Sequence, residues 1–270
     1  MSDFVGKIKR VKDLRKAKGC TFAQIRKAED ELGLKFPEEY KDYVLEFGHI
    51  DFGPTEWTGL NVIKRLDTVH ATQKARAEND KFPPKCFVLE DWGIEGIKAI
   101  VNEEGAVFLW DNDQSEPFRE SMSKYLDYCI ARDLIDKINT IDRLNEYGHC
   151  TDEQIEQAQE ELDLEFPEEY TEYVKEFGCI SFGAAKWTGL GVTGEQNTVE
   201  ATQKAKSANR KFPDGYFVLE FLNDGKKAAI VNEDGYVFIM DNGRISYADK
   251  YDSISDYLDY CIQRESNKTK

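Results

Sequence analysis

Histidine is scarce in this chain: there are three in 270 residues, and no two have the spacing of metal ligands. The sequence also contains no C-x-x-C pair and no apolar run near 18 residues, which excludes the common zinc motifs and a membrane-spanning helix. The N-terminal segment MSDFVGKIKR has no apolar signal core. We therefore expect no metal, no membrane and a cytoplasmic location, where the six cysteines are reduced core thiols.

Basic residues are fewer than acidic ones. The chain has 36 Lys and Arg against 52 Asp and Glu, a net charge of −16. Residues 133–270 hold 28 acids and 15 bases, or −13, whereas residues 1–132 hold 24 acids and 21 bases, or −3. Such acidity argues against nucleic-acid binding. It fits either a merely soluble protein or one with a basic partner.

The chain is a tandem duplication. Residues 20–112 align with residues 150–242 without a gap, and 51 of the 93 positions are identical. The match resumes after a two-residue insertion in the second copy, where Tyr125–Ile130 returns as Tyr257–Ile262. We predict two homologous domains, residues 1–132 and 133–270, each large enough for its own core. A motif present in one copy only is not expected to belong to shared chemistry.

Each copy shows helical periodicity first and strand patterns later. Capping boxes at Thr21 and Thr151 start a helix, and Pro37 and Pro167 open the next. The full set predicted in the first copy is helices at 3–16, 22–32, 37–47, 68–78 and 121–132, and strands at 57–62, 87–90, 97–102 and 106–111. We therefore predict an α+β fold, a mostly antiparallel sheet flanked by N-terminal helices and a C-terminal helix. The closing helix of the first copy is expected to run almost directly into the second copy.

The candidate catalytic and cofactor motifs are either absent from one copy or explained by local structure. Gly189–Gly194 matches the dinucleotide pattern G-x-G-x-x-G, but it is placed here in a strand continuing from Trp187, and the first copy lacks the glycines. No histidine occurs at a shared position to activate a cysteine. The paired acids Glu38-Glu39 and Glu168-Glu169 are explained as first-turn residues of a helix. We expect no cofactor, no nucleotide and no enzymatic activity.

The repeated helix motif F-P-x-x-Y-x-x-Y-V-x-x-F-G occurs at Phe36–Gly48 and Phe166–Gly178. It is followed by strands ending in Trp110-Asp111 or Met240-Asp241, and then by the closing helix. This order resembles the SUKH superfamily, which includes yeast Smi/Knr-type cell-wall regulators and bacterial YobK-like immunity proteins. The resemblance covers nearly all of both copies. It implies a helix-flanked sheet without catalytic residues, and in bacteria an immunity protein that neutralises a cognate toxin, often a nuclease.

The leading hypothesis is a non-enzymatic immunity protein that binds a basic polymorphic toxin. The alternative is a regulatory protein-binding scaffold of the Smi/Knr type. The toxin, the copy that contacts it and the oligomeric state stay open. Since the second copy carries most of the charge, its acids are the first candidates for partner binding, and shared acids of the first copy are the second. The residues are Glu168, Glu169, Glu172, Glu176, Glu220 and Asp241, then Glu39, Glu90 and Asp111.

Overall fold

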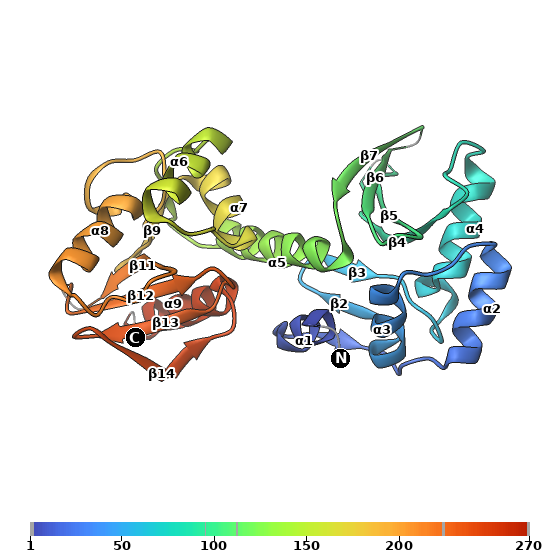
Figure 1. Ribbon diagram of the computed structural model, residues 1–270, viewed down its shortest axis with the longest axis horizontal. Coiled ribbons are helices and arrows are strands. Elements are labelled where there is room, and N and C mark those ends of the chain that lie inside the picture. Colours follow the sequence, from blue (N-terminus) through green and yellow to red (C-terminus); the bar gives the residue numbers. More distant parts are fainter. Residues whose placement is uncertain (1–2, 95, 112, 223–224, 269–270) are drawn as a thin grey trace. The chain divides into compact units, whose positions relative to one another are not determined.

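The computed structural model describes residues 3–94, 96–111, 113–222 and 225–268. The chain forms two compact units, Met1–Cys129 and Ile130–Lys270. Each unit has the predicted α+β fold, and the elements of the first unit recur in the second in the same order (Figure 1). The paired strands of both units are antiparallel.

The elements have the following bounds. The first unit contains α1 (Asp3–Arg10), β1 (Arg15–Lys16), α2 (Phe22–Leu32), α3 (Glu38–Phe47), β2 (Ile50–Phe52), β3 (Thr55–Trp57), the 3-10 helix η1 (Lys64–Leu66), α4 (Thr68–Glu78), β4 (Cys86–Asp91), β5 (Lys98–Asn102), β6 (Val107–Asp111) and β7 (Gln114–Arg119). Helix α5 (Met122–Asn139) spans the division between the units. The second unit continues with β8 (Asn145–Glu146), α6 (Asp152–Leu162), α7 (Glu168–Phe177), β9 (Ile180–Phe182), β10 (Ala185–Lys186), η2 (Gly194–Gln196), α8 (Thr198–Ala208), β11 (Tyr216–Leu222), β12 (Lys227–Asn232), β13 (Val237–Asp241), β14 (Arg244–Tyr251) and α9 (Ile254–Lys268).

The strands pair in chain order. In the first unit β1 to β7 form one sheet, although β3 and β4 are joined only through Trp57 and Glu90. In the second unit the same weak point is a single bridge between Trp187 and Glu220, so the described strands form a three-stranded sheet, β10-β9-β8, and a four-stranded sheet, β11 to β14. The two units therefore share one topology.

The sheet is packed on both faces because side chains alternate along each strand. In β11, Phe217 and Leu219 belong to the main core with the tyrosines of α7, whereas Val218 belongs to a smaller cluster with Ala201 and Ala205 of α8. Helix α4 contacts β4 in the same way in the first unit (Figure 1). Each unit is thus a three-layer structure with its own core.

Local start signals are confirmed by the structure. Thr21 and Thr151 each complete a capping box with the glutamine three residues on. Helices α3 and α7 begin directly after Pro37 and Pro167. Helix α4 has the predicted bounds, and all six cysteines are buried thiols outside any disulfide.

Helix α5 belongs to both units. Its first half buries Met122, Leu126 and Cys129, and its second half supplies Leu134 and Ile138 to the core of the second unit. The predicted boundary after residue 132 lies inside this helix. Residues 130–139 thus occupy the place in the second unit that α1 occupies in the first.

The predicted helix 3–16 is wrong beyond Arg10. The chain turns at Asp13, whose φ of 54° is left-handed, and Arg15 and Lys16 then pair with β2. Strand β7 was not predicted because its sequence, QSEPFR, is polar and contains a proline. Such a strand is tolerated at the edge of a sheet, which is where β7 lies.

The predicted strand 57–62 is also wrong, since β3 ends at Trp57. Thr58 N still donates to Leu89 O of β4 at 2.6 Å, but the chain then packs on the C-terminal end of α3, where Leu60 N donates to Gly48 O at 3.0 Å. A Cβ at Gly59 would lie 1.5 Å from that same oxygen, so the position requires glycine. The second unit repeats this geometry at Gly189. The predicted strand is therefore wrong there too: residues 189–193 form a loop, and Gly194 begins η2.

Candidate functional site

Two of the predicted partner-binding acids are buried. Glu220 is 0% exposed and accepts hydrogen bonds from Tyr257 Oη at 2.5 Å and Arg264 Nη2 at 2.7 Å. Glu90 is 1% exposed and accepts one from Tyr125 Oη at 2.7 Å. Both carboxylates tie the sheet to the closing helix. The prediction that they contact a partner is therefore corrected: neither reaches the surface.

Glu169 and Glu39 cap the closing helices. Glu169 accepts hydrogen bonds from Ile254 N at 3.2 Å and Ser255 N at 2.9 Å, and Glu39 accepts them from Met122 N at 3.0 Å and Ser123 N at 3.3 Å. These N–H groups have no partner within their own helix, so a carboxylate satisfies them well. Glu169 is 7% exposed, and its predicted role in partner binding is corrected too. Glu39 is only partly exposed and is engaged by the helix.

Burial raises the pKa of Glu169 from 4.5 to about 7, against the opposing effect of the two backbone hydrogen bonds. The folded chain therefore holds this proton to a higher pH than the unfolded chain does. Between pH 4.5 and 7 the folded state binds more protons, so its stability falls as pH rises through that window, by about 2–3 kcal/mol.

Glu169→Gln should remove this contribution, since the amide is neutral at every pH. Urea unfolding at pH 4.5, 5.5 and 7 measures it: relative to wild type, the variant should gain stability as pH rises. Glu168→Gln, at the neighbouring, partly exposed position, is the control and should follow wild type. A constant difference between E169Q and wild type across this range would contradict the assignment.

The remaining acids of α7 form a line on the surface. Glu168, Glu172 and Glu176 are spaced four residues apart, which places them on one face of the helix. Glu176 is exposed, and Glu168 and Glu172 are partly exposed. Lys175 lies 3.7 Å from Glu172 and pairs more closely with Asp152, at 2.7 Å. We call Glu168, Glu172 and Glu176 the acidic stripe.

The SUKH_5 family model, described as SMI1-KNR4 cell-wall, matches residues 1–130 and again residues 131–263. The chain belongs to the SUKH family. No curated protein matches it. Membership supports a protein-binding role of the immunity type, and the family is generally a non-enzymatic one.

The two SUKH units differ in how far basic side chains neutralise this face. In the first unit the aligned acids are Glu38, Asp42 and Glu46. Lys41 Nζ lies 2.8 Å from Glu38, and Lys9 Nζ lies 2.7 Å from Glu46. The second SUKH unit has Thr171 and Asn139 at the positions of these lysines, so neither ion pair can form there. The repetition of the acids in both copies does not predict this difference in neutralisation, because the acids are shared and their lysine partners are not.

The last two predicted acids lie at strand ends. Asp241 ends β13, is partly exposed and pairs with Lys227 at 3.0 Å. Asp111 ends β6 and is exposed. Both are accessible, but no described contact brings either to the acidic stripe. The stripe is therefore the part of the predicted set that the SUKH fold gathers on one exposed surface.

Within the described ranges, no three His, Cys, Asp or Glu side chains are grouped closely enough to hold a metal ion. The same part of the chain contains no helix with the length and apolarity needed to cross a membrane. Burial raises the pKa of Cys20, Cys86, Cys150 and Cys179 to about 11. These thiols are thus poor nucleophiles near neutral pH.

Proposed function

We propose that the protein is a non-enzymatic immunity protein that binds and neutralises a basic protein toxin, and that the acidic stripe of the second unit is its main contact. The observation that carries the proposal is that Lys9 and Lys41 of the first unit are replaced by Asn139 and Thr171 on a face whose acids are kept, while Lys175 replaces Leu45. Lys175 is the basic side chain described beside Glu172, so three acids of the stripe face one lysine and the stripe keeps a net negative charge that attracts a basic partner. Family membership supports the protein-binding class.

A nuclease is the toxin class that suits this surface best. An enzyme that holds phosphates must itself present basic side chains. An acidic inhibitor is attracted to those side chains, associates faster and can cover the substrate site. The net charge of −13 on residues 133–270 adds long-range attraction to the local contact.

A regulatory scaffold for endogenous proteins is the second candidate. The observation that favours it is the description of the matching family model, which refers to the cell wall. The two candidates differ in the partner: an immunity protein binds one toxin tightly, whereas a scaffold binds proteins of its own cell that lack toxic activity.

The test uses the full chain as bait in extracts of its native source. Wild type is compared with E172K/E176K in the second unit and with D42K/E46K at the aligned positions of the first. We expect a basic toxin domain to be captured by wild type and by the first-unit variant. The second-unit variant should lose it, by about tenfold or more in affinity, since two attractions become repulsions.

Identification by mass spectrometry and an assay of the captured protein complete the experiment. Capture of non-toxic endogenous regulators would favour the scaffold. Equal capture by both charge-reversed variants would refute the role of the stripe, provided that circular dichroism shows both variants to be folded.

A further inference from the structure

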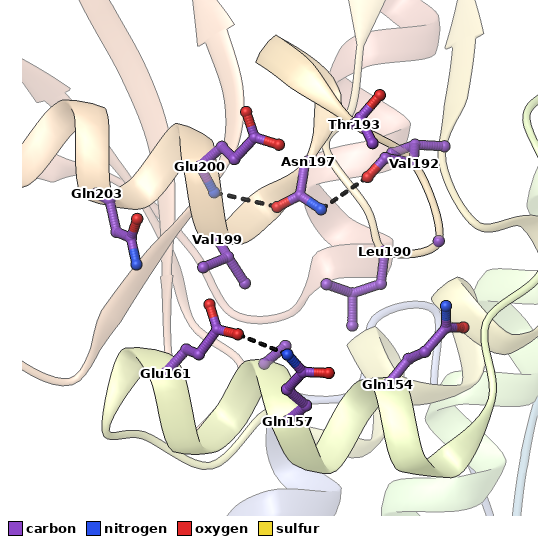
Figure 2. A pocket seen from close by; sticks show the side chains of 12 residues that line it. Gln154, Gln157, Glu161, Leu190, Val192, Thr193, Asn197, Val199, Glu200 and Gln203 are labelled. Carbon is purple, nitrogen blue, oxygen red and sulfur yellow. Dashed lines mark hydrogen bonds between the residues drawn. The ribbon is translucent and has the colours of Figure 1, made fainter.

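A groove of about 370 Å³ lies in the second unit between α6 and α8. Its floor is apolar: Leu190, Ala158 and Val199 are 3%, 4% and 8% exposed. Its rim is polar and exposed, and includes Gln157, Glu161 and Gln203. Figure 2 shows Gln157 and Glu161 rising from α6 toward Leu190 and Val199, with Gln203 directed toward α6 from the other wall.

In the first unit, an asparagine links the loop after β3 to α2, the counterpart of α6. Asn61 stands where the second unit has Gly191, and both backbones are left-handed, with φ of 62° and 74°. Asn61 Oδ1 accepts a hydrogen bond from Gln24 Nε2 at 3.0 Å, which joins the loop to α2. Gly191 has no side chain and cannot form this link, so the end of the groove is open.

The first unit also carries its own cation at this place. Lys27 Nζ lies 3.5 Å from Glu31, which is the counterpart of Glu161. The second unit has Gln157 at the position of Lys27, and its Nε2 donates to Glu161 Oε1 at 2.8 Å. A hydrogen bond from a neutral side-chain amide leaves the negative charge of Glu161 in place. It also leaves the amide oxygen of Gln157 able to accept another hydrogen bond.

We propose that this groove binds an arginine or lysine side chain from an extended segment of the partner protein. The aliphatic stem covers the floor of Leu190, Ala158 and Val199, as long basic side chains do on apolar surfaces. The cationic end donates to the Glu161 carboxylate and to the amide oxygens of Gln157 and Gln203. Arginine fits best, because its planar guanidinium has five donors for several acceptors at once.

The inference rests on the proposed function for the identity of the partner, but it can be tested without the partner. The probe is the peptide acetyl-Gly-Ala-Arg-Ala-Gly-amide, and its control has neutral citrulline at the arginine position. Binding to the full-length chain is followed by nitrogen-15 NMR, including the side-chain amides of Gln157 and Gln203. We expect the arginine peptide to shift signals in 154–161 and 190–203, and the citrulline peptide to shift them much less.

Two variants exchange the features of the two units. Gln157→Lys installs the lysine of the first unit at an exposed position and should weaken the peptide about tenfold, because it neutralises Glu161 and repels the guanidinium. The double variant K27Q/N61G should do the reverse and produce new peptide-induced shifts around Gln24 and Glu31. Retention of the remaining spectrum shows that each variant is folded.

Equal shifts with arginine and citrulline, shifts spread over all acidic faces, or an unchanged affinity in Q157K would each overturn the inference. Its failure is distinguishable from failure of the proposed function. Equal capture of a toxin by wild type and Q157K would show that the groove lies outside the interface, and would leave the proposed function intact. Peptide binding in the groove without any toxin among the captured proteins would support the groove and refute the proposed function.

Discussion

Glu220→Ala is expected to destabilise the second unit by about 3–5 kcal/mol. The Glu220 carboxylate is fully buried and is the acceptor for Tyr257 Oη and Arg264 Nη2. Removing it takes the closer of two described carboxylate partners from Arg264, whose side chain is 16% exposed, and leaves Glu265 at 3.2 Å. The loss of the buried acceptor for both Arg264 and Tyr257 adds to the loss of packing, which makes this one of the largest effects we expect in the chain.

Native-state hydrogen exchange of the amides in β11 and β12 measures the effect, because it separates the second unit from the first. The double variant E220L/R264M, which removes both charges and keeps the volume, should recover most of the loss. Glu176→Gln on the exposed surface should change stability by no more than about 0.5 kcal/mol. A cost below about 1 kcal/mol for E220A would show that the buried ion pair does not hold α9 to the sheet.

Gly189→Ala is expected to cost more than about 3 kcal/mol. A Cβ at this position would lie 1.7 Å from Gly178 O, and Leu190 N donates to that oxygen at 3.1 Å. The methyl group can be accommodated only if the loop moves off the end of α7, which would break the hydrogen bond and disturb the buried Leu190.

Gly194→Ala, at the first residue of η2, is the matched control. Its φ is 81°, but a Cβ there would meet nothing within 4 Å, so the substitution should cost only about 1–2 kcal/mol of backbone strain. Urea unfolding compares the two variants. Equal losses would mean that the close approach of the two backbones is not what requires glycine at position 189.

Sequence was sufficient where the determining interactions are local. The capping glutamines lie three residues from Thr21 and Thr151, and the bounds of α4 follow from contacts within one helix. The duplication strengthened these predictions, because each signal appears twice. It also predicted the family correctly, since the shared positions preserve the order of elements that the family model matches.

Sequence was insufficient where a residue acts at long range. Glu169 lies in the first turn of α7, yet it caps α9, which begins more than 80 residues later in the chain. Glu220 accepts a hydrogen bond from Arg264, which is 44 residues away in the sequence. The net charge of the second copy predicts both acids as partner contacts, whereas the structure buries them in contacts within the unit. The useful signal was a different one: positions such as Lys27 and Gln157, where the two copies differ in charge, indicate where their surfaces diverged.

Whether the net negative charge of the acidic stripe attracts a basic partner is measured by the salt dependence of association with the captured protein. Stopped-flow or surface-plasmon measurements between 50 and 500 mM NaCl give the rate constant for wild type and E172K/E176K. We expect a rate constant that falls steeply with salt in wild type and a much weaker dependence in the variant, since exposed charges are screened. A wild-type rate that is independent of salt, or the same dependence in both proteins, would contradict it.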